Sequence, residues 1–405
     1  MASGRNWGAA NVPVTRRIFL TGTAATVTAG ALAAGCSSQS STVAREALVY
    51  PAGPADAALD QALTRLVQQP NGPPGAIALV QRGSKRLLHR AGVADLDGKI
   101  PIQAADSMRL ASVAKAFSGA VALSAAADGA LSLSDTVGKW LPKLPRAWSR
   151  VTLRDVLNHT SGIADFSQTD AFRQDLLKSL LKAPPPQKLL SYAGTCLNFT
   201  PGSMYDYSNS DNIVVGLMVQ AATGKSYQAE LAERVYGPLG LRRTSLPNGA
   251  AVPAPLIHGY SLDPPKSPED VTEVIAAGWS WASGGIVSTP DDAGTFIRAY
   301  ARGATTSPAL YKKQFTFRSG SSEPTGPGQN SAGLAIFRYQ TKYGTVYGHT
   351  GNTLGYTQFI AATADGSRSV VVSVNAQITP TANQDRFPDL RQIYLLAVGA
   401  ALANG

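Results

Sequence analysis

Two β-hairpin patterns, one toward each end of the chain, constrain the fold more than any other feature of this sequence. Residues 76–83 and 85–96 are two apolar runs joined by a glycine turn, which predicts a pair of strands. Residues 355–364 and 367–376 form a second pair, joined at Asp365-Gly366, a dipeptide typical of tight hairpins. Strands that flank a helical middle in this way favour one antiparallel sheet built from both ends of the chain.

Helical patterns occupy the flanks and the middle of the chain. Residues 55–69 carry leucines at helical spacing, and residues 388–402 begin with a proline in the first turn. Between about 116 and 300, helical patterns alternate with proline- and glycine-rich loops, and the clearest of them, 212–223, stops at a glycine. The fold class predicted for residues 55–405 is therefore α/β (α+β): an antiparallel sheet with flanking helices and an inserted, mostly helical subdomain.

The first residues resemble an export signal rather than part of a domain. Residues 15–20 (TRRIFL) resemble the twin-arginine motif, and the weakly apolar stretch behind them ends in a lipobox-like sequence at Cys36. The stretch is short for a transmembrane helix and diluted by threonine and glycine. We expect residues 1–35 to be a cleaved signal peptide, Cys36 to carry lipid, and residues 36–54 to form a tether. The protein would then lie at the outer face of the cytoplasmic membrane, with plain secretion as the alternative.

Composition narrows the range of functions. The 405 residues are 44% hydrophobic, enough for a large core. The net charge of +10 is scattered, without the basic stripe of a nucleic-acid-binding protein. Four histidines and two cysteines are never spaced as metal ligands, and no glycine-rich phosphate loop follows a strand. We therefore expect a monomer without metal, cofactor or nucleic acid. With Cys36 lipidated, Cys196 has no disulfide partner and is expected to be a packed, unreactive side chain.

Ser112 and Lys115 open an alanine-rich helical pattern over residues 112–127. Two residues three positions apart on a helix lie on the same face, about one turn from each other. A serine hydroxyl needs a neighbouring base, and a desolvated lysine can have its pKa lowered toward that task. The same spacing recurs at Ser179 and Lys182, in a charged stretch that runs into three prolines and is predicted to be a solvated helix end. The spacing alone therefore does not identify the nucleophile.

Two further triplets follow Ser112 in the chain. They are Tyr207-Ser208-Asn209 and His349-Thr350-Gly351, and each occurs once. Ser-x-x-Lys, Tyr-x-Asn and Lys/His-Thr-Gly in this order resemble the serine beta-lactamase and D-alanyl-D-alanine carboxypeptidase superfamily. The tyrosine form resembles its class C-like branch, which also holds esterases and D-aminopeptidases. Further segments that resemble this branch cover most of the chain beyond the signal peptide: 153–163, 200–212, 236–247 and 281–297.

The resemblance implies a role for each residue of the three motifs. Ser112 would attack a carbonyl carbon and form an acyl-enzyme, and Asn209 would hydrogen-bond the substrate amide. Lys115 and Tyr207 would handle protons, and which of them deprotonates Ser112 stays open. The backbone N–H groups of Ser112 and Asn352 would form the oxyanion hole. The remaining residues expected to bind substrate are His349, Thr350 and Gly351.

His349 replaces the lysine of a Lys-Thr-Gly pattern. A histidine with an ordinary pKa near 6.5 is only partly charged at neutral pH. We therefore expect hydrolysis of carboxylate-bearing substrates to weaken as pH rises through the His349 pKa. Arg338, upstream on the preceding strand, is either a permanent charge for the substrate or a surface arginine. The resemblance implies that His159, in Asn158-His-Thr-Ser-Gly162, is structural and fixes a loop.

The predicted activity is that of a serine hydrolase acting through a covalent acyl-enzyme. The leading hypothesis is a D-alanyl-D-alanine carboxypeptidase acting on peptidoglycan peptides. The alternatives on the same site are an esterase, a D-aminopeptidase and a class C-type beta-lactamase, so the partner is a small peptide, ester or beta-lactam. A different class, a catalytically silent penicillin-binding lipoprotein, is disfavoured because a binding module has no need of Lys115.

Overall fold

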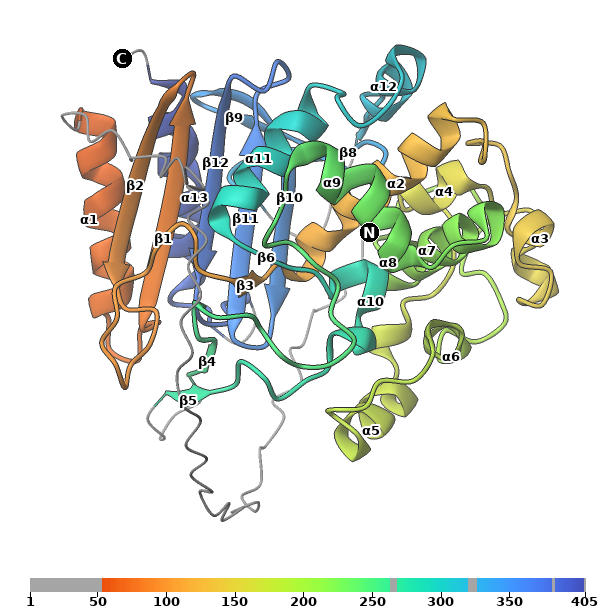
Figure 1. Cartoon of the computed structure of the whole chain (residues 1–405), viewed down its shortest axis with the longest axis horizontal. Coiled ribbons are helices and arrows are strands. Elements are labelled where there is room, and N and C mark those ends of the chain that lie inside the picture. Colours follow the sequence, from red (N-terminus) through yellow and green to blue (C-terminus); the bar gives the residue numbers. More distant parts are fainter. Residues whose placement is uncertain (1–52, 263–267, 320–325, 381–382, 404–405) are drawn as a thin grey trace, which may run out of the picture.

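Strands from both ends of the chain lie side by side in one sheet (Figure 1). The computed structural model describes residues 53–262, 268–319, 326–380 and 383–403. The sheet is antiparallel, in the order β2-β1-β12-β11-β10-β9-β8-β7. This confirms the predicted sheet. The strands are β1 (Gly75–Arg82), β2 (Lys85–Gly92), β7 (Arg318–Ser319), β8 (Gln329–Ala332), β9 (Phe337–Thr341), β10 (Gly344–Thr353), β11 (Tyr356–Ala362) and β12 (Arg368–Val374).

Both predicted hairpins form, with small differences at their ends. The turns carry left-handed glycines, Gly83 (φ 57°) and Gly366 (φ 68°), a conformation that glycine adopts without steric cost. Strand β2 ends at Gly92, four residues before the predicted end, because Gly92 takes a φ of 70° and turns the chain away. The signal peptide predicted for residues 1–35, Cys36 and the tether up to residue 52 lie outside the described residues.

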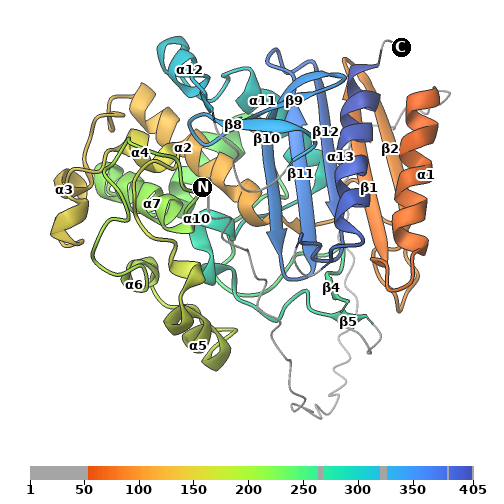
Figure 2. The same cartoon turned by 180° about the vertical axis from the view of Figure 1, so that it is seen from behind.

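Helices cover both faces of the sheet. Helices α1 (Pro54–Gln68) and α13 (Phe387–Leu402) pack against each other on one face, and α11 (Pro290–Ala301) packs on the opposite face (Figures 1 and 2). Strand β12 reflects this arrangement: Val370 and Val372 join the core under α13, while Val371 between them joins the core on the other side. A strand buried on both faces is apolar without alternation, which explains its run of valines.

The helical region lies beside the sheet and is inserted between β2 and β7. Within it are two short strand pairs, β3 (Met108–Arg109) with β6 (Val287–Ser288) and β4 (Tyr260–Ser261) with β5 (Glu269–Asp270). Besides α11, the helices between β2 and β7 are α2 (Ala114–Ala127), α3 (Val137–Trp140), α4 (Leu153–Leu157), α5 (Asp170–Lys178), α6 (Pro186–Ser191), α7 (Asn209–Thr223), α8 (Tyr227–Leu231), α9 (Gly237–Leu239), α10 (Trp281–Gly284) and α12 (Pro308–Gln314). Helical turns of other types are η1 (Ala111–Val113), η2 (Arg146–Trp148), η3 (Phe166–Gln168), η4 (Ala232–Tyr236) and η5 (Ala277–Trp279).

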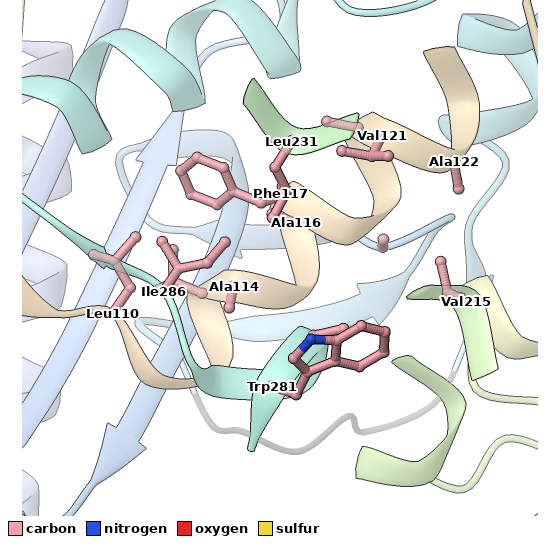
Figure 3. Close-up of a cluster of buried hydrophobic side chains, with 14 of the residues drawn as sticks. Leu110, Ala114, Ala116, Phe117, Val121, Ala122, Val215, Leu231, Trp281 and Ile286 are labelled. Atoms are coloured by element: carbon pink, nitrogen blue, oxygen red, sulfur yellow. The ribbon is translucent and has the colours of Figure 1, made fainter. Parts of the chain in front are cut away.

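Helix α2 runs through the centre of the helical region and is buried on all sides (Figure 3). Phe117 stacks on Phe296 of α11 with ring centroids 3.6 Å apart. A side chain at Gly119 would meet Ala335 at 2.3 Å. A helix that is apolar all round belongs in a core, and its small residues let neighbouring elements approach closely. The start of α2 is therefore held in place from several directions.

Two further expectations can be compared with the structure. Cys196 is exposed, so the prediction of a packed side chain is wrong. It lies in the irregular segment after α6, where its backbone carbonyl, rather than its sulfur, contacts the core by accepting a long hydrogen bond from Trp148. In the described part of the chain, no helix combines the length and the apolar character needed to cross a membrane.

Candidate active site

Ser112 lies in the turn η1, immediately before α2, rather than inside the helix as predicted. Its neighbours Ala111 and Val113 are buried, whereas Ser112 is partly exposed. Ala111 adopts a left-handed φ of 49°, which costs a residue with a Cβ about 1–2 kcal/mol. The surrounding core must hold this strained turn, and it thereby presents the Ser112 hydroxyl at the start of a helix.

Lys115 is fully buried and lies within hydrogen-bonding distance of three oxygens. Its Nζ is 3.1 Å from Ser112 Oγ, 2.7 Å from Asn209 Oδ1 and 2.8 Å from the carbonyl oxygen of Ser283. Burial lowers the pKa of Lys115 to about 7, although the nearby carboxylate of Asp165 opposes the shift. A neutral amine has two hydrogens and one lone pair. It can donate to the two carbonyl oxygens and accept the proton of Ser112.

Asn209 begins α7, three residues before the predicted start of that helix, because Ser208 caps the helix end. Its Oδ1 accepts from Lys115, and its Nδ2 donates to Asp165 Oδ2 (2.9 Å) and Ser167 Oγ (3.0 Å). Both amide hydrogens are thus used inside the protein, which leaves one lone pair on Oδ1 for the expected contact with substrate. Sequence reasoning missed Asp165, because no motif links it to a residue 44 positions later.

Tyr207 lies among the other motif residues. Its ring is largely buried, and its centroid is 4.9 Å from Lys115 Nζ and 6.4 Å from the ring of His349. The ring of His159 packs against it at 4.5 Å. The structure therefore brings the first residues of all three motifs together, although almost 240 positions separate Ser112 from His349.

Strand β10 supplies the third side of the site. Strand β9 pairs with it only as far as Gly348, so the last residues of β10 continue past the end of β9. A Cβ at Gly351 would lie 2.4 Å from the carbonyl oxygen of Leu110, just before η1. Glycine is required here because the backbone of the Ser112 turn rests directly on the strand.

The pairing pattern orients the backbone of Asn352. A two-residue turn joins Thr353 to Tyr356, and the residues that close such a turn exchange both hydrogen bonds. The next pair, Asn352 and Thr357, is then not hydrogen-bonded. The N–H of Asn352 points away from β11, toward the edge that β9 leaves open. The side-chain Nδ2 of Asn352 donates to Ile378 O and to Thr357 Oγ1.

His349 is buried, and the hydrogen bond of its ring determines its tautomer. Its Nδ1 is hydrogen-bonded to the carbonyl oxygen of Thr350, which can only accept, so the hydrogen sits on Nδ1. Nε2 is then an acceptor, and no hydrogen-bond donor among the described residues reaches it. Burial and the charge of Lys115 lower the pKa of His349 to about 3. The expectation of a partly charged histidine at neutral pH is therefore wrong.

The family assignment follows from the comparisons. The beta-lactamase family model matches residues 59–395 of the chain. The chain belongs to the beta-lactamase family. Within the matched residues, Ser112 and Lys115 lie in hydrogen-bonding distance.

Three relatives illustrate the range of the family. The D-aminopeptidase of Brucella anthropi is 30% identical over 195 residues, which are 48% of this chain and 37% of that protein. Penicillin-binding protein 4* of Bacillus subtilis (strain 168) is 23% identical, over 75% of this chain and 68% of that protein. A solved structure, a D-stereospecific amidohydrolase from Streptomyces sp., is 30% identical with a TM-score of 0.71, over 79% of this chain and 94% of that chain. The chain thus spans little more than a third of the D-aminopeptidase that it matches.

The remaining candidates lie away from this family site. Ser179 follows α5, and its hydroxyl donates to the carbonyl oxygen of Lys182, whose side chain is exposed. Arg338 donates to Ser331 Oγ and lies over the ring of Phe317, so it does not replace a charge at position 349. Thr350 pairs with Phe359, on the sheet face that α13 covers. Within the described ranges, no three histidine, cysteine or acidic side chains are grouped to hold a metal ion.

Proposed function

We propose that this protein is a serine amidohydrolase for small D-amino acid amides or peptides with an N-terminal D-residue. Ser112 would form the acyl-enzyme, and water would release the acid. The Ser112–Lys115 contact supports the acyl-transfer chemistry. Similarity to a D-aminopeptidase and a D-stereospecific amidohydrolase supports the class of substrate.

The proposed reaction begins with proton transfer from Ser112 to Lys115. Ser112 Oγ then bonds to the substrate carbonyl carbon, and the oxygen that becomes negative lies between the N–H groups of Ser112 and Asn352. Loss of one such donor costs about a hundred- to a thousand-fold in rate. The proton moves through Lys115 or Tyr207 to the leaving nitrogen as the C–N bond breaks. Water then attacks the ester carbon, and its proton returns to Ser112 Oγ.

The observation that carries the proposal is the buried acceptor on His349. Nε2 has a lone pair and no donor within reach among the described residues. A substrate amide or ammonium N–H that reached this nitrogen would satisfy it, whereas a substrate carboxylate there would place acceptor against acceptor. The carboxylate of Asp165, hydrogen-bonded to Asn209, adds a negative charge to the same region. Both features favour a substrate without a free carboxylate at the leaving residue.

A D-alanyl-D-alanine carboxypeptidase that acts on peptidoglycan peptides is the second candidate. It is supported by the three motifs in their order and by similarity to penicillin-binding protein 4* over three quarters of the chain. In this case the substrate carboxylate would have to bring a proton onto His349 Nε2. The two candidates therefore differ in the charge state that position 349 must adopt.

A matched pair of substrates separates the candidates. Acetyl-D-alanyl-D-alanine and acetyl-D-alanyl-D-alaninamide differ only in the terminal carboxylate. We expect kcat/KM to be higher for the amide by about tenfold or more, a difference of about 1.4 kcal/mol in transition-state binding. Preference for the carboxylate would establish the carboxypeptidase instead, and turnover of p-nitrophenyl acetate alone would indicate an esterase.

Controls for the nucleophile use the duplicated spacing. Ser112→Ala should abolish turnover and labelling by fluorescent penicillin. Ser179→Ala, which alters an exposed copy of the same Ser-x-x-Lys spacing, should leave both unchanged. Wild-type protein that neither turns over any of these substrates nor takes up label would favour a catalytically silent binding protein.

We also propose that the chain is exported by the twin-arginine route and anchored through a lipid on Cys36. The motif at residues 15–20 and the lipobox-like end at Cys36 support this. A single acyl chain holds a protein at a membrane only marginally, so a diacylated cysteine is required. Cys36→Ser should move the protein from the membrane fraction to the medium. Membrane retention of this variant would contradict lipid anchoring.

A further inference from the structure

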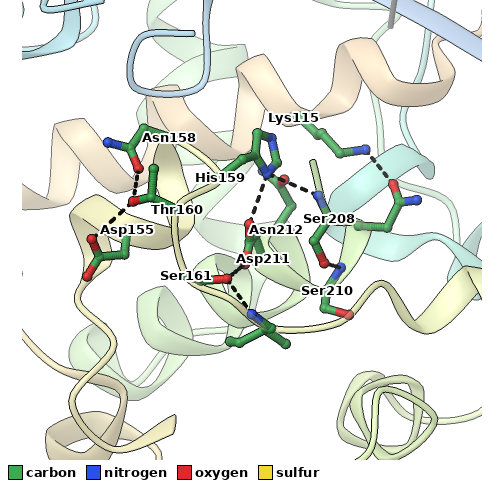
Figure 4. A network of polar contacts seen from close by, with 12 residues as sticks. Lys115, Asp155, Asn158, His159, Thr160, Ser161, Ser208, Ser210, Asp211 and Asn212 are labelled. Atoms are coloured by element: carbon green, nitrogen blue, oxygen red, sulfur yellow. Dashed lines mark hydrogen bonds and ion pairs between the residues drawn. The ribbon is translucent and has the colours of Figure 1, made fainter. Parts of the chain in front are cut away.

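His159 contacts consecutive residues of the segment that carries Tyr207, and Figure 4 shows its contact with Ser208. Its carbonyl oxygen accepts from the N–H of Asp206 at 2.9 Å. Its ring packs against the Tyr207 ring at 4.5 Å, and its Nδ1 accepts from the N–H of Ser208 at 3.4 Å. His159 adopts a left-handed φ of 58°. In this conformation its carbonyl group and its ring both contact the segment 206–208.

The same Nδ1 meets a buried carboxyl group. Asp211 lies in the first turn of α7 with no exposed surface, and its Oδ2 is 2.9 Å from His159 Nδ1. Its other oxygen, Oδ1, accepts from the hydroxyl of Ser161. The loop after α4 and the start of α7 are thus joined through one buried pair of ionisable groups.

Hydrogen counting determines the state of this pair. The Ser208 N–H can only donate, so His159 Nδ1 must present a lone pair to it. The hydrogen between Nδ1 and Asp211 then belongs to the carboxyl group. Nδ1 has one lone pair, which the Asp211 O–H at 2.9 Å and the more distant Ser208 N–H at 3.4 Å share. We propose that His159 is a positioning residue for Tyr207, and that it accepts hydrogen bonds from Ser208 and from a protonated Asp211. The pair carries no net charge.

The charges around the pair agree with this arrangement. Burial raises the pKa of Asp211 well above its usual range, and the nearby carboxylates of Asp155, Asp165 and Asp206 push it in the same direction. Burial, together with Lys115 and His349, lowers the pKa of His159 well below its usual value. Both shifts favour the neutral forms that the hydrogen bonds assign, and Tyr207 is then held without an additional anion near Lys115.

The inference rests on the proposed function only in that Tyr207 takes part in proton transfer. It is tested with p-nitrophenyl ester turnover, which does not depend on which amide is the natural substrate. His159→Asn keeps an acceptor near the Nδ1 position and tolerates a left-handed φ, whereas His159→Ala keeps neither. We expect His159→Ala to lower kcat by about a hundredfold with KM nearly unchanged, and His159→Asn to restore most of the loss.

The protonation state has a readout that needs no activity. Asp211→Asn is isosteric with the protonated acid, because its amide donates to His159 and accepts from Ser161. A carboxyl group with a raised pKa in the folded protein binds a proton that the unfolded chain has released, so stability falls as pH rises above about 4. From pH 5 to 7 the unfolding constant of the wild type should rise about tenfold per pH unit relative to Asp211→Asn.

Two results would overturn the inference. Equal pH dependence of unfolding for wild type and Asp211→Asn would show that Asp211 is already ionised in the folded protein. Loss of kcat in His159→Asn as large as in His159→Ala, with both variants folded by circular dichroism, would show that the acceptor at Nδ1 does not position Tyr207. A failure of the proposed amide specificity would leave both measurements intact, because neither uses an amide substrate.

Discussion

Lys115 Nζ lies 3.1 Å from Ser112 Oγ, at the end of a side chain that has no solvent-exposed surface. Desolvation disfavours the ammonium form, and the pKa of this lysine is lowered from 10.5 to about 7. The proposed base therefore titrates near neutral pH, beside the proposed nucleophile. This pair determines the pH behaviour expected of the enzyme.

The acid limb of the pH profile should report the pKa of Lys115. Only the neutral amine accepts the Ser112 proton, so kcat/KM for a neutral ester should rise with pH through about 7 and level off above it. His349, with a pKa lowered to about 3, should contribute no limb near 6.5. Initial rates measured from pH 5 to 9 check this. A flat profile across that range would contradict Lys115 as the base.

Asp165→Asn should move that limb to lower pH. The Asp165 carboxylate raises the pKa of Lys115, so removing its charge lowers that pKa further, while the amide still accepts from Asn209. The pH profile of ester hydrolysis measures the shift. Asp170→Asn is the matched control, because this carboxylate is exposed and pairs with Arg173 on the surface. A shift toward higher pH in Asp165→Asn would contradict the assignment.

Gly351→Ala should impair catalysis by displacing the Ser112 turn. The new methyl group would lie 2.4 Å from Leu110 O, and backbone cannot yield as a side chain can. We expect kcat/KM to fall by about a hundredfold, the effect of a misplacement of about 1 Å. Gly249→Ala, where no atom lies within 4 Å, should behave as wild type. Full activity of Gly351→Ala would show that η1 can move away from the new methyl group without displacing Ser112.

Phe117→Ala should destabilise the protein by about 3–5 kcal/mol, since it leaves a cavity between α2 and α11. Chemical denaturation measures this loss. The control is Leu177→Ala, because the leucine side chain is half exposed at the end of α5 and should contribute less than about 0.5 kcal/mol. Comparable losses for the two variants would contradict the central position of α2.

Much of the fold could be predicted because its signals are local. Apolar runs and turn glycines identified both hairpins, and helical spacing identified α1, α2 and α13 to within a few residues. The predicted helix ends were less accurate. Helix α7 begins at Asn209 rather than at residue 212, because Ser208 caps its first turn and the sequence pattern did not reveal this cap. The shift matters, since it places Asn209 on the first turn beside Lys115.

The sequence by itself determined the sheet built from both chain ends and the family motifs, and it singled out Ser112 as the proposed nucleophile. Only the tertiary structure decided the charge states, because a pKa depends on burial and on neighbours that lie far away in the chain. It buried Lys115 beside Asn209, placed Asp165 behind that amide, and turned His349 into a neutral acceptor. It also left Cys196 exposed, where residue type alone favoured packing.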